Sequence, residues 1–501
     1  MKFASLSLSG KQQLVPEVLA PENADLKQLS AIDELPLIPQ NHHFIFSKIL
    51  QLALAGKKLL LDELPFDLNT LHEHYENGYL AYDYGVKKRK GGPFCNRCGN
   101  KHPDLFASFK CARCMEVCTY CRHCIMSGRV SECTPLLSWT GPPLTYQMQK
   151  NPLIWDGELS SGQQTASDHV VEAVRNHSSL LVWAVCGAGK TEVLFKGIGQ
   201  ALKTGLKVCL AAPRTDVVLE LAPRLKEVFP DTEIITLYGG SEDRTRQGRL
   251  VITTTHQLLR YDRSFDVIII DEVDAFPYSL DSSLQYAADQ AAKEEAARIY
   301  LTATPSKQLK RKVKKNQLPA VRIPARYHGQ PLPLPEFKWC GQWKKHISKG
   351  KLPVRVEKWV NTRLEENIPA FLFVPDLETL QQTVNILKNF SHDIEGVHAA
   401  DLNRKEKVEK FRRSEISLLV TTTILERGVT VAGLDAAVLG SEAAIFTESA
   451  LVQIAGRVGR SAAQPRGNVT FFHFGATEAM QLAYNHINKM NKEARDSGLL
   501  K

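Results

Sequence analysis

The residues best suited to chemistry lie in the stretch from Leu180 to Glu192, which reads LLVWAVCGAGKTE. Its apolar run predicts a buried strand, its glycines a loop, and the residues from Lys190 onward a helix. Gly187 and Gly189 allow the backbone to curl so that successive N–H groups face one anion. Lys190 is then placed to reach the β and γ phosphates of a nucleotide such as ATP, and the Thr191 hydroxyl to bind Mg²⁺. The pattern predicts a phosphate-binding loop; the alternative is an ordinary strand-to-helix turn with a solvated lysine.

A pair of carboxylates, Asp271 and Glu272, follows the apolar run that starts after Asp266. We expect Asp271 to hold Mg²⁺ through water and Glu272 to orient and deprotonate the attacking water. An acidic strand end is usually only a turn. Its place about 80 residues after a phosphate loop, on a buried strand, favours the catalytic interpretation.

Two arginines, Arg457 and Arg460, lie in the segment from Ala450 to Arg460, which predicts a helix. Because they are three positions apart, they are expected to share one helix face. Planar guanidinium groups suit a γ-phosphate that is reached across a domain cleft. The alternative is a solvated surface pair.

Cysteines form a second candidate site. Eight of the eleven lie between residues 95 and 133. Clustered CxxC pairs in a long chain without a recognisable export signal indicate metal ligands rather than disulfides. One CxxC pair supplies two corners of a tetrahedral Zn²⁺ site, so two pairs close it. The candidate ligands are Cys95, Cys98, Cys111, Cys114, Cys118, Cys121, Cys124 and Cys133.

The spacing allows more than one pairing of these thiols, with one or two zinc ions. In a ribbon, Cys95 and Cys98 share an ion with Cys111 and Cys114. A nested scheme has an outer set, Cys95, Cys98, Cys121 and Cys124, and an inner set, Cys111, Cys114, Cys118 and Cys133. His102 and His123 could replace a thiol, but each is expected to be solvated or locally hydrogen-bonded.

Gln163 is a candidate for reading the adenine ring. It precedes a predicted amphipathic helix that ends near His177, a short distance before the phosphate loop. Its side-chain amide could pair with the donor and acceptor of adenine. A solvated glutamine at a helix N-terminus is an equally weighted alternative.

The elements that must position these residues are those of an α/β fold. Continuous apolar runs near residues 207, 250, 266 and 299 alternate with helical segments, which indicates a parallel sheet covered on both faces. Ligands of such sheets bind at the carboxyl ends of the strands, where the polar clusters fall. Runs near residues 369, 418 and 468 predict a second domain of the same kind.

The predicted organisation has five parts. They are an N-terminal region (1–90), a zinc-binding module (91–135), a first RecA-like domain (150–306), a basic and proline-rich linker (307–340) and a second RecA-like domain (341–490).

Composition is that of a soluble globular protein of several domains. The chain has 501 residues, 43% hydrophobic and 23% charged, with a net charge of +9 that mildly favours an anionic partner such as nucleic acid. No apolar run approaches the roughly 20 residues that span a bilayer. We therefore expect a cytoplasmic protein, with peripheral attachment to the inner face of the membrane as an option.

The ordered motifs resemble those of superfamily-2 nucleic-acid ATPases with two RecA-like domains. They are GKT at 189–191, DEVD at 271–274, TAT at 302–304 and QIAGRVGR at 453–460. The sequences CRHCIMSGRV from Cys121, DEVDAFP from Asp271 and ILERGVT from Ile424 resemble the ComFA competence proteins, which are similar to primosomal restart helicases.

The resemblance implies an ATPase stimulated by single-stranded DNA that helps to draw transforming DNA through a ComEC-like membrane channel. ComFC-like and DprA-like proteins are the implied neighbours, and the oligomeric state stays open. The resemblance also assigns Gln453, Arg457 and Arg460 to a sensor helix. It assigns Thr302 and Thr304 to the coupling between ATP hydrolysis and domain closure.

Three functions are compatible with the sequence: a single-strand DNA translocase, a duplex-unwinding helicase of the replication-restart type, and a binding scaffold that ATP only gates. In the first, Pro213-Arg214, Thr253 to Thr255 and Thr422-Thr423 would contact DNA phosphates with little sequence preference. The short chain disfavours the helicase. The presence of Glu272, Arg457 and Arg460 disfavours the scaffold, since a gate needs no water-activating base.

Overall fold

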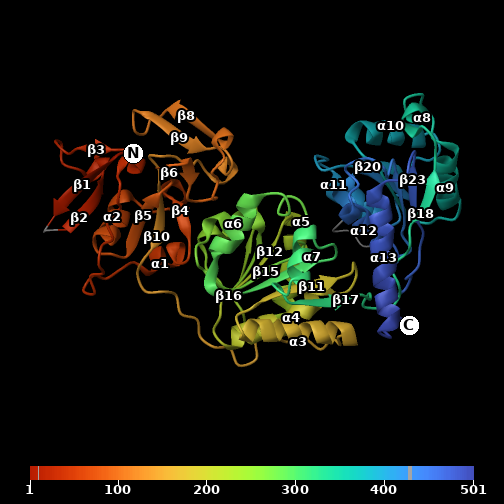
Figure 1. Ribbon diagram of the computed structural model, residues 1–501, viewed down its shortest axis with the longest axis horizontal. Helices are drawn as coiled ribbons and strands as arrows, with labels where there is room; N and C mark the ends of the chain where they lie inside the picture. Colours follow the sequence, from red (N-terminus) through yellow and green to blue (C-terminus); the bar gives the residue numbers. More distant parts are fainter. Residues whose placement is uncertain (9–10, 427–430) are drawn as a thin grey trace. The chain divides into compact units, whose positions relative to one another are not determined.

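The computed structural model describes residues 1–8, 11–426 and 431–501 (Figure 1). Its chain divides into two compact units. The first comprises Met1–Trp155, Val171–Ser179 and Phe195–Tyr300, and the second Asp156–Val170, Leu180–Leu194 and Leu301–Lys501. Among the described residues, none of the helices is both long and apolar enough to cross a membrane.

The N-terminal part of the first unit is built from two small antiparallel sheets. One has the order β2-β1-β3 and the other β4-β10-β5. Strand β10 comes from beyond the cysteine segment and pairs with both β4 and β5, so the cysteine segment is an insertion in this fold. The elements are β1 (Phe3–Leu8), β2 (Lys11–Pro16), β3 (Leu26–Lys27), α1 (Lys48–Leu54), β4 (Lys58–Leu60), α2 (Leu68–Glu76), β5 (Leu80–Tyr84) and β10 (Pro135–Trp139).

A core of aliphatic and aromatic side chains holds this part together, including Phe3, Leu50, Tyr75 and Leu137. Helix α2 starts at Leu68 because the Asp67 carboxylate accepts a hydrogen bond from the Thr70 N–H. Helix α1 begins at Lys48, where the Ser47 side chain accepts a hydrogen bond from the Leu50 N–H.

The cysteine segment contains two short hairpins in place of a large core. Strand β6 (Val86–Arg89) pairs with β7 (Gly92–Cys95), and β8 (Phe106–Lys110) with β9 (Val117–Cys121). All eight cysteines of the segment are buried. Thiols therefore occupy the interior positions that aliphatic side chains fill in larger domains.

A seven-stranded sheet carries the phosphate-loop motif, with the order β13-β14-β12-β15-β16-β11-β17. Its pairs β12·β14, β12·β15 and β15·β16 are parallel, as the continuous apolar runs predicted. The strands are β11 (Ser179–Ala184), β12 (Val208–Ala212), β13 (Ile234–Leu237), β14 (Leu250–Thr254), β15 (Phe265–Ile270), β16 (Ala292–Thr302) and β17 (Ala320–Ile323). The helices are α3 (Ser161–Arg175), α4 (Lys190–Lys203), α5 (Thr215–Val228), α6 (Ser282–Ala291) and α7 (Lys307–Lys314).

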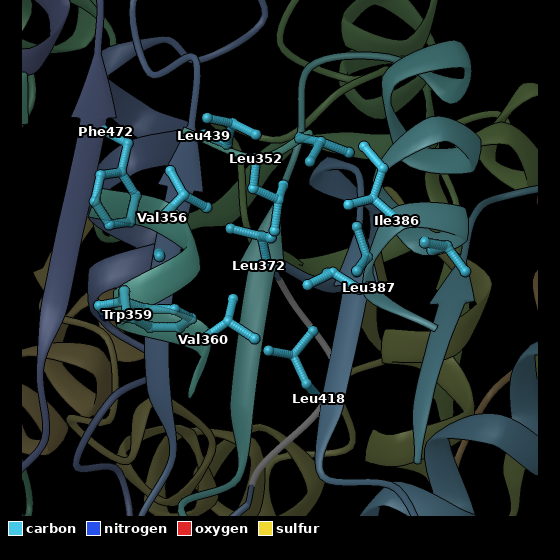
Figure 2. Close-up of a cluster of buried hydrophobic side chains, with 14 of the residues drawn as sticks. Leu352, Val356, Trp359, Val360, Leu372, Ile386, Leu387, Leu418, Leu439 and Phe472 are labelled. Carbon is cyan, nitrogen blue, oxygen red and sulfur yellow. The ribbon is translucent and has the colours of Figure 1, made fainter. Parts of the chain in front are cut away.

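The C-terminal sheet is parallel, with the order β18-β23-β22-β19-β21-β20. Trp359 and Val360 of α9 pack beside Leu372 of β19 in its core (Figure 2). Its strands are β18 (Glu336–Trp339), β19 (Ala370–Phe373), β20 (Ile394–Val397), β21 (Leu418–Thr421), β22 (Asp435–Leu439) and β23 (Val469–His473). Its helices are α8 (Trp343–Ile347), α9 (Val354–Glu365), α10 (Leu377–Leu387), α11 (Arg404–Arg412), α12 (Glu448–Ala455) and α13 (Glu478–Asp496).

The predicted fold class is confirmed: two parallel sheets with helices follow a cysteine-rich module. The predicted linker, 307–340, is more ordered than expected, because it contains helix α7 and strands β17 and β18. Each strand lies at the edge of a sheet, where a short apolar stretch needs only one partner strand. Such edge strands leave a weak signal in a basic, proline-rich sequence.

Candidate functional site

The phosphate-loop motif has the backbone that its glycines were expected to provide. Strand β11 ends at Ala184 and helix α4 begins at Lys190. Gly187 and Gly189 adopt φ values of +80° and +70°, which side-chain-bearing residues rarely adopt. The loop can therefore present successive N–H groups, together with the positive end of the α4 dipole, to one phosphate.

Gln163 braces this loop. Its side chain is 5% exposed, and Nε2 donates to the carbonyl of Ala188 at 2.9 Å. Oε1 accepts a hydrogen bond from the Ser160 N–H at 2.8 Å. A Cβ atom at Gly189 would lie 2.3 Å from Gln163 Nε2, so this packing requires glycine. The glutamine contacts the predicted nucleotide loop, and a contact with adenine stays a prediction.

The acidic pair directly follows β15. The Asp271 N–H donates to the carbonyl of Ala211 at 2.8 Å, which fixes the strand end, and Asp271 Oδ1 accepts from the Glu272 N–H at 2.8 Å. Glu272 has a φ of +52°. Non-glycine residues in this region are uncommon and cluster at functional sites, because the surrounding structure must offset the strain.

The structure corrects the prediction for the two arginines. Helix α12 ends at Ala455, with Gly456 as its C-cap, and Gly459 has a φ of +64°. Arg457 and Arg460 thus lie in the turn beyond the helix and do not share a helix face. Two glycines so close together favour chain reversal over another helical turn. Arg457 is buried and Arg460 is half-buried.

Within the second unit, this turn lies against the phosphate loop. Cys186 Sγ donates to Gln453 Oε1 at 2.9 Å. A Cβ atom at Gly456 would lie 2.3 Å from Cys186 Cβ, and one at Gly187 would lie 3.6 Å from Arg460 Cγ. Gln453 Nε2 is buried without a hydrogen-bond partner among the described residues. The loop and the predicted sensor residues therefore come together, and an amide donor is left for an acceptor.

Arg326 joins the same site, although a lone arginine after β17 is no signal of such a role. It is 2% exposed, and its guanidinium donates to the carbonyls of Gly459 and Val458. The next residue, Tyr327, donates its N–H to the carbonyl of Gly187 at 3.0 Å. Burial lowers the pKa of Arg326 to about 10, so it remains charged at neutral pH.

Thr304 connects the end of β16 to helix α12. Its Oγ1 lies 2.7 Å from Ser449 Oγ, in the first turn of that helix, and its N–H donates to Thr302 Oγ1 at 3.0 Å. Of the two hydroxyl residues predicted to couple hydrolysis to domain movement, Thr304 thus contacts the helix that precedes the sensor arginines, and Thr302 contacts Thr304.

The predicted strand contacts are corrected in part. The side chains of Thr253, Thr254 and Thr255 are buried, so their hydroxyls cannot touch a DNA backbone. Arg214 pairs with Asp216 at 3.0 Å. Thr422 and Thr423 are half-buried, and residues 427–430 of the ILERGVT motif lie outside the described residues.

The thiols form two groups that could hold metal ions, and the nested pairing is the one observed. One group contains Cys95, Cys98, Cys121 and Cys124, the other Cys111, Cys114, Cys118 and Cys133, and the sulfur atoms of each lie within 4.8 Å of one another. The separations are 3.8 Å for Cys95–Cys124, 3.6 Å for Cys98–Cys121 and 3.7 Å for Cys111–Cys133.

These distances fit zinc. A tetrahedral ion with Zn–S bonds of about 2.3 Å separates its sulfur ligands by about 3.8 Å. Side-chain amides also approach the sulfurs: Asn100 Nδ2 lies 3.5 Å from Cys121 Sγ, and Gln28 Nε2 lies 3.4 Å from Cys114 Sγ. Such donors stabilise thiolates and orient metal ligands.

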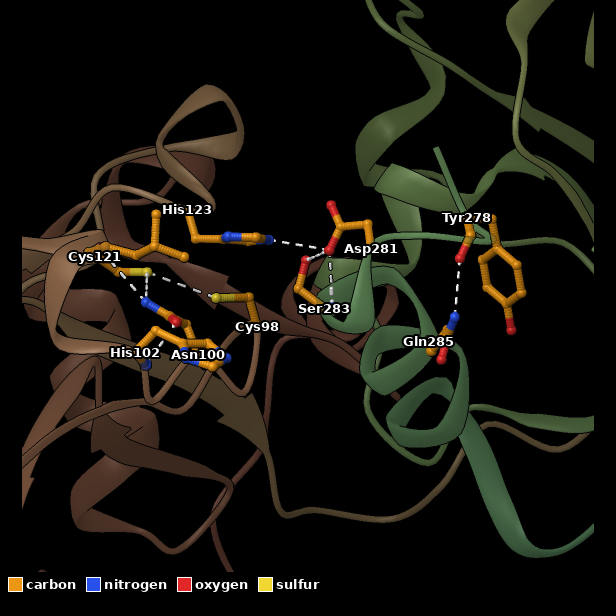
Figure 3. A network of polar contacts seen from close by, with 10 residues as sticks. Cys98, Asn100, His102, Cys121, His123, Tyr278, Asp281, Ser283 and Gln285 are labelled. Carbon is orange, nitrogen blue, oxygen red and sulfur yellow. Dashed lines mark hydrogen bonds and ion pairs between the residues drawn. The ribbon is translucent and has the colours of Figure 1, made fainter. Parts of the chain in front are cut away.

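His123 is not a ligand of either group but contacts the adjoining sheet domain of the first unit. Its Nε2 lies 3.0 Å from Asp281 Oδ1, and the same carboxylate caps helix α6 by accepting from the Ser283 N–H at 2.8 Å (Figure 3). Because His123 lies between Cys121 and Cys124, the outer thiol group is connected to the start of α6. Nothing in the sequence indicated this partner.

Arg97, between two of the thiols, is buried. It pairs with Glu63 at 2.9 Å, and Arg260 pairs with the same carboxylate at 2.7 Å. Burial tends to raise the pKa of Glu63, but the two guanidinium groups outweigh it and hold that pKa below its usual value. Arg97 therefore anchors the cysteine segment.

Three protein-family models match successive parts of the chain. Residues 40–138 match the competence protein ComFA N-terminal domain, 156–307 the type III restriction enzyme res subunit, and 355–462 the helicase conserved C-terminal domain. The competence protein ComFA of Bacillus subtilis is 49% identical over 91% of this chain and 98% of its own length. The competence protein ComFA of Streptococcus pneumoniae is 36% identical over 82% of this chain and 93% of its own length.

A more distant relative is the replication restart protein PriA of Haemophilus influenzae, 26% identical over 32% of this chain and 26% of its own length. The helicase domain matches, together with the phosphate loop, support a nucleic-acid-dependent ATPase. The identity and coverage of the two ComFA relatives establish the family. The chain belongs to the ComFA family of competence proteins and is a helicase-like ATPase.

Proposed function

We propose that the chain is an ATP-driven translocase that moves along single-stranded DNA and drives the uptake of transforming DNA across the cytoplasmic membrane. The observation that carries the proposal is the contact of the phosphate loop with the end of α12 and the turn that follows it, through Cys186–Gln453 and Gly187–Arg460. A scaffold that only binds nucleic acid has no need for arginines beside a phosphate loop. An enzyme that couples ATP hydrolysis to movement needs such arginines.

Lys190 and the loop N–H groups would hold the β and γ phosphates of ATP. Thr191 and Asp271 offer the hard oxygen ligands that Mg²⁺ prefers, and Mg²⁺ would neutralise charge on those phosphates. The Glu272 carboxylate would accept a proton from the attacking water. Arg457 and Arg460 would stabilise the charge that develops on the transferred phosphoryl group.

Movement would arise from the connection between β16 and α12. ATP at the phosphate loop would favour one arrangement of the Thr304–Ser449 contact, and hydrolysis would release it. The contacts between the enzyme and the DNA strand would exchange with each cycle of ATP hydrolysis. A ComEC-like channel and ComFC-like and DprA-like proteins are proposed partners, and attachment to the membrane would then depend on them.

The test is ATP turnover by the purified chain, alone, with single-stranded DNA and with blunt duplex. We expect strong stimulation by single strands and weak stimulation by duplex. Lys190→Ala, which removes a loop charge and no core contact, should abolish turnover in all three reactions. Equal stimulation by duplex would favour the duplex-unwinding alternative, and turnover indifferent to DNA would contradict the proposal.

A further inference from the structure

A cavity lies beside the inner thiol group, where the cysteine segment meets the N-terminal fold. Its volume is about 450 Å³, within the about 300–1,000 Å³ typical of small-molecule pockets. It is lined by Asp62, Phe109, Lys110, Cys111, Ala112, Arg113, Arg129, Ser131 and Thr134. Nothing in the ATPase site described above uses these residues.

The charge of the lining is positive. Arg113 pairs with Asp62 at 2.6 Å, which neutralises one cation. Lys110 and Arg129 are exposed, and neither forms an ion pair within the described part of the chain. Two cationic side chains thus remain for an anionic ligand.

Phe109 gives the cavity an aromatic wall. Its ring meets that of Tyr120, which is not part of the lining, edge to face, with ring centroids 5.4 Å apart. The Arg129 guanidinium lies 5.0 Å from the Phe109 centroid and 5.7 Å from that of Tyr120. A planar cation over an aromatic ring is an arrangement on which a nucleobase can stack.

We infer that this cavity binds one nucleotide of a single DNA strand, its base against Phe109 and Arg129 and its phosphate on Lys110 and Arg129. Phosphate alone needs no aromatic wall, and a duplex keeps its base faces covered by stacking. Ser131 and Thr134, whose hydroxyls lie 2.6 Å apart, supply further polar groups in the lining. The inference rests on the proposed function, since it assigns part of the strand to the cysteine segment.

The fold of the segment explains why the cavity would keep its shape. Phe109 packs against the inner thiol group. Its backbone partner on β9 is Cys118, one of the four thiols of that group. A metal ion held there would fix the hairpin that presents the aromatic wall and its cations.

The experiment is fluorescence anisotropy of the full chain with a labelled oligothymidylate and with the same strand made abasic. Phe109→Leu keeps an apolar side chain against the thiols and removes the ring face. Loss of one stacked base should weaken binding about fivefold to a hundredfold. The abasic strand should bind wild type and Phe109→Leu equally. Phe109→Tyr should restore binding.

Arg129→Gln tests the cation, with Arg122→Gln as the matched control, because Arg122 is an exposed arginine of the same segment outside the cavity. Arg129→Gln should weaken binding and Arg122→Gln should not. Zinc content, measured on each variant, should equal that of wild type. Unchanged affinity of Phe109→Leu, or an equal loss on the abasic strand, would overturn the inference. If single strands still stimulate ATP turnover in wild type and in Phe109→Leu, the proposed function stands without this site.

Discussion

His123 Nε2 lies 3.0 Å from Asp281 Oδ1, so that a hydrogen bond joins the outer thiol group to the N-cap of α6. Eight residues, 273–280, separate the acidic pair at Asp271 and Glu272 from Asp281. A change in the cysteine segment therefore has a direct route to the backbone that follows the predicted catalytic carboxylates. We interpret this contact as part of the coupling between DNA binding and ATP turnover.

His123→Ala should retain zinc and basal ATP turnover but lower the stimulation by single-stranded DNA severalfold. The reason is that α6 loses the side chain that connects its capping residue to the thiol group. The measurement is turnover against DNA concentration, with His102→Ala, an exposed histidine of the same segment, as control. Full stimulation in His123→Ala would show that the contact transmits nothing.

Zinc content should be two ions per chain. Each structural zinc supplies roughly 10 kcal/mol or more of apparent binding energy. Cys95→Ala should therefore lose the outer ion and Cys111→Ala the inner ion, with basal ATP turnover retained because the phosphate loop and the acidic pair lie outside the segment. Metal analysis of purified protein checks this. One ion per chain in wild type, or two in either variant, would be incompatible with the nested groups.

Glu272→Gln should bind ATP normally and lose turnover by about a hundredfold or more, since it removes the base and keeps the side-chain shape. Nucleotide binding can be followed with a fluorescent ATP analogue. Lys190→Ala is the contrasting variant, expected to lose binding as well. If Glu272→Gln abolishes binding, its carboxylate does not act on the water.

Several of these features follow from the sequence for physical reasons. Gly187 and Gly189 were predictable because only glycine adopts positive φ freely, and the parallel sheets because continuous apolar runs require burial on both faces. The pairing of the eight thiols was not predictable, because CxxC spacing is local. The nested order depends on how β7 and β9 meet. Arg326 and Arg97 were also out of reach. Their roles come from burial against residues distant in sequence, which a lone charged residue does not reveal.

Arg457→Ala and Arg460→Ala should each lower the kcat of ATP hydrolysis more than they raise KM, because their contacts strengthen as charge develops on the transferred phosphate. DNA affinity without nucleotide should change little. Arg457→Lys is the informative companion, since it keeps the charge and loses the planar fork. Normal kcat in either alanine variant would mean that its arginine does not act on the phosphate.

The most direct test of the central claim is how ATP turnover depends on the length of the single strand. A translocase that steps along DNA spends longer on a longer strand before it dissociates. Turnover per chain at saturating DNA should therefore rise with strand length and then reach a plateau. Turnover that is independent of length, once the strand is long enough to bind, would contradict translocation and leave an ATPase that DNA only switches on.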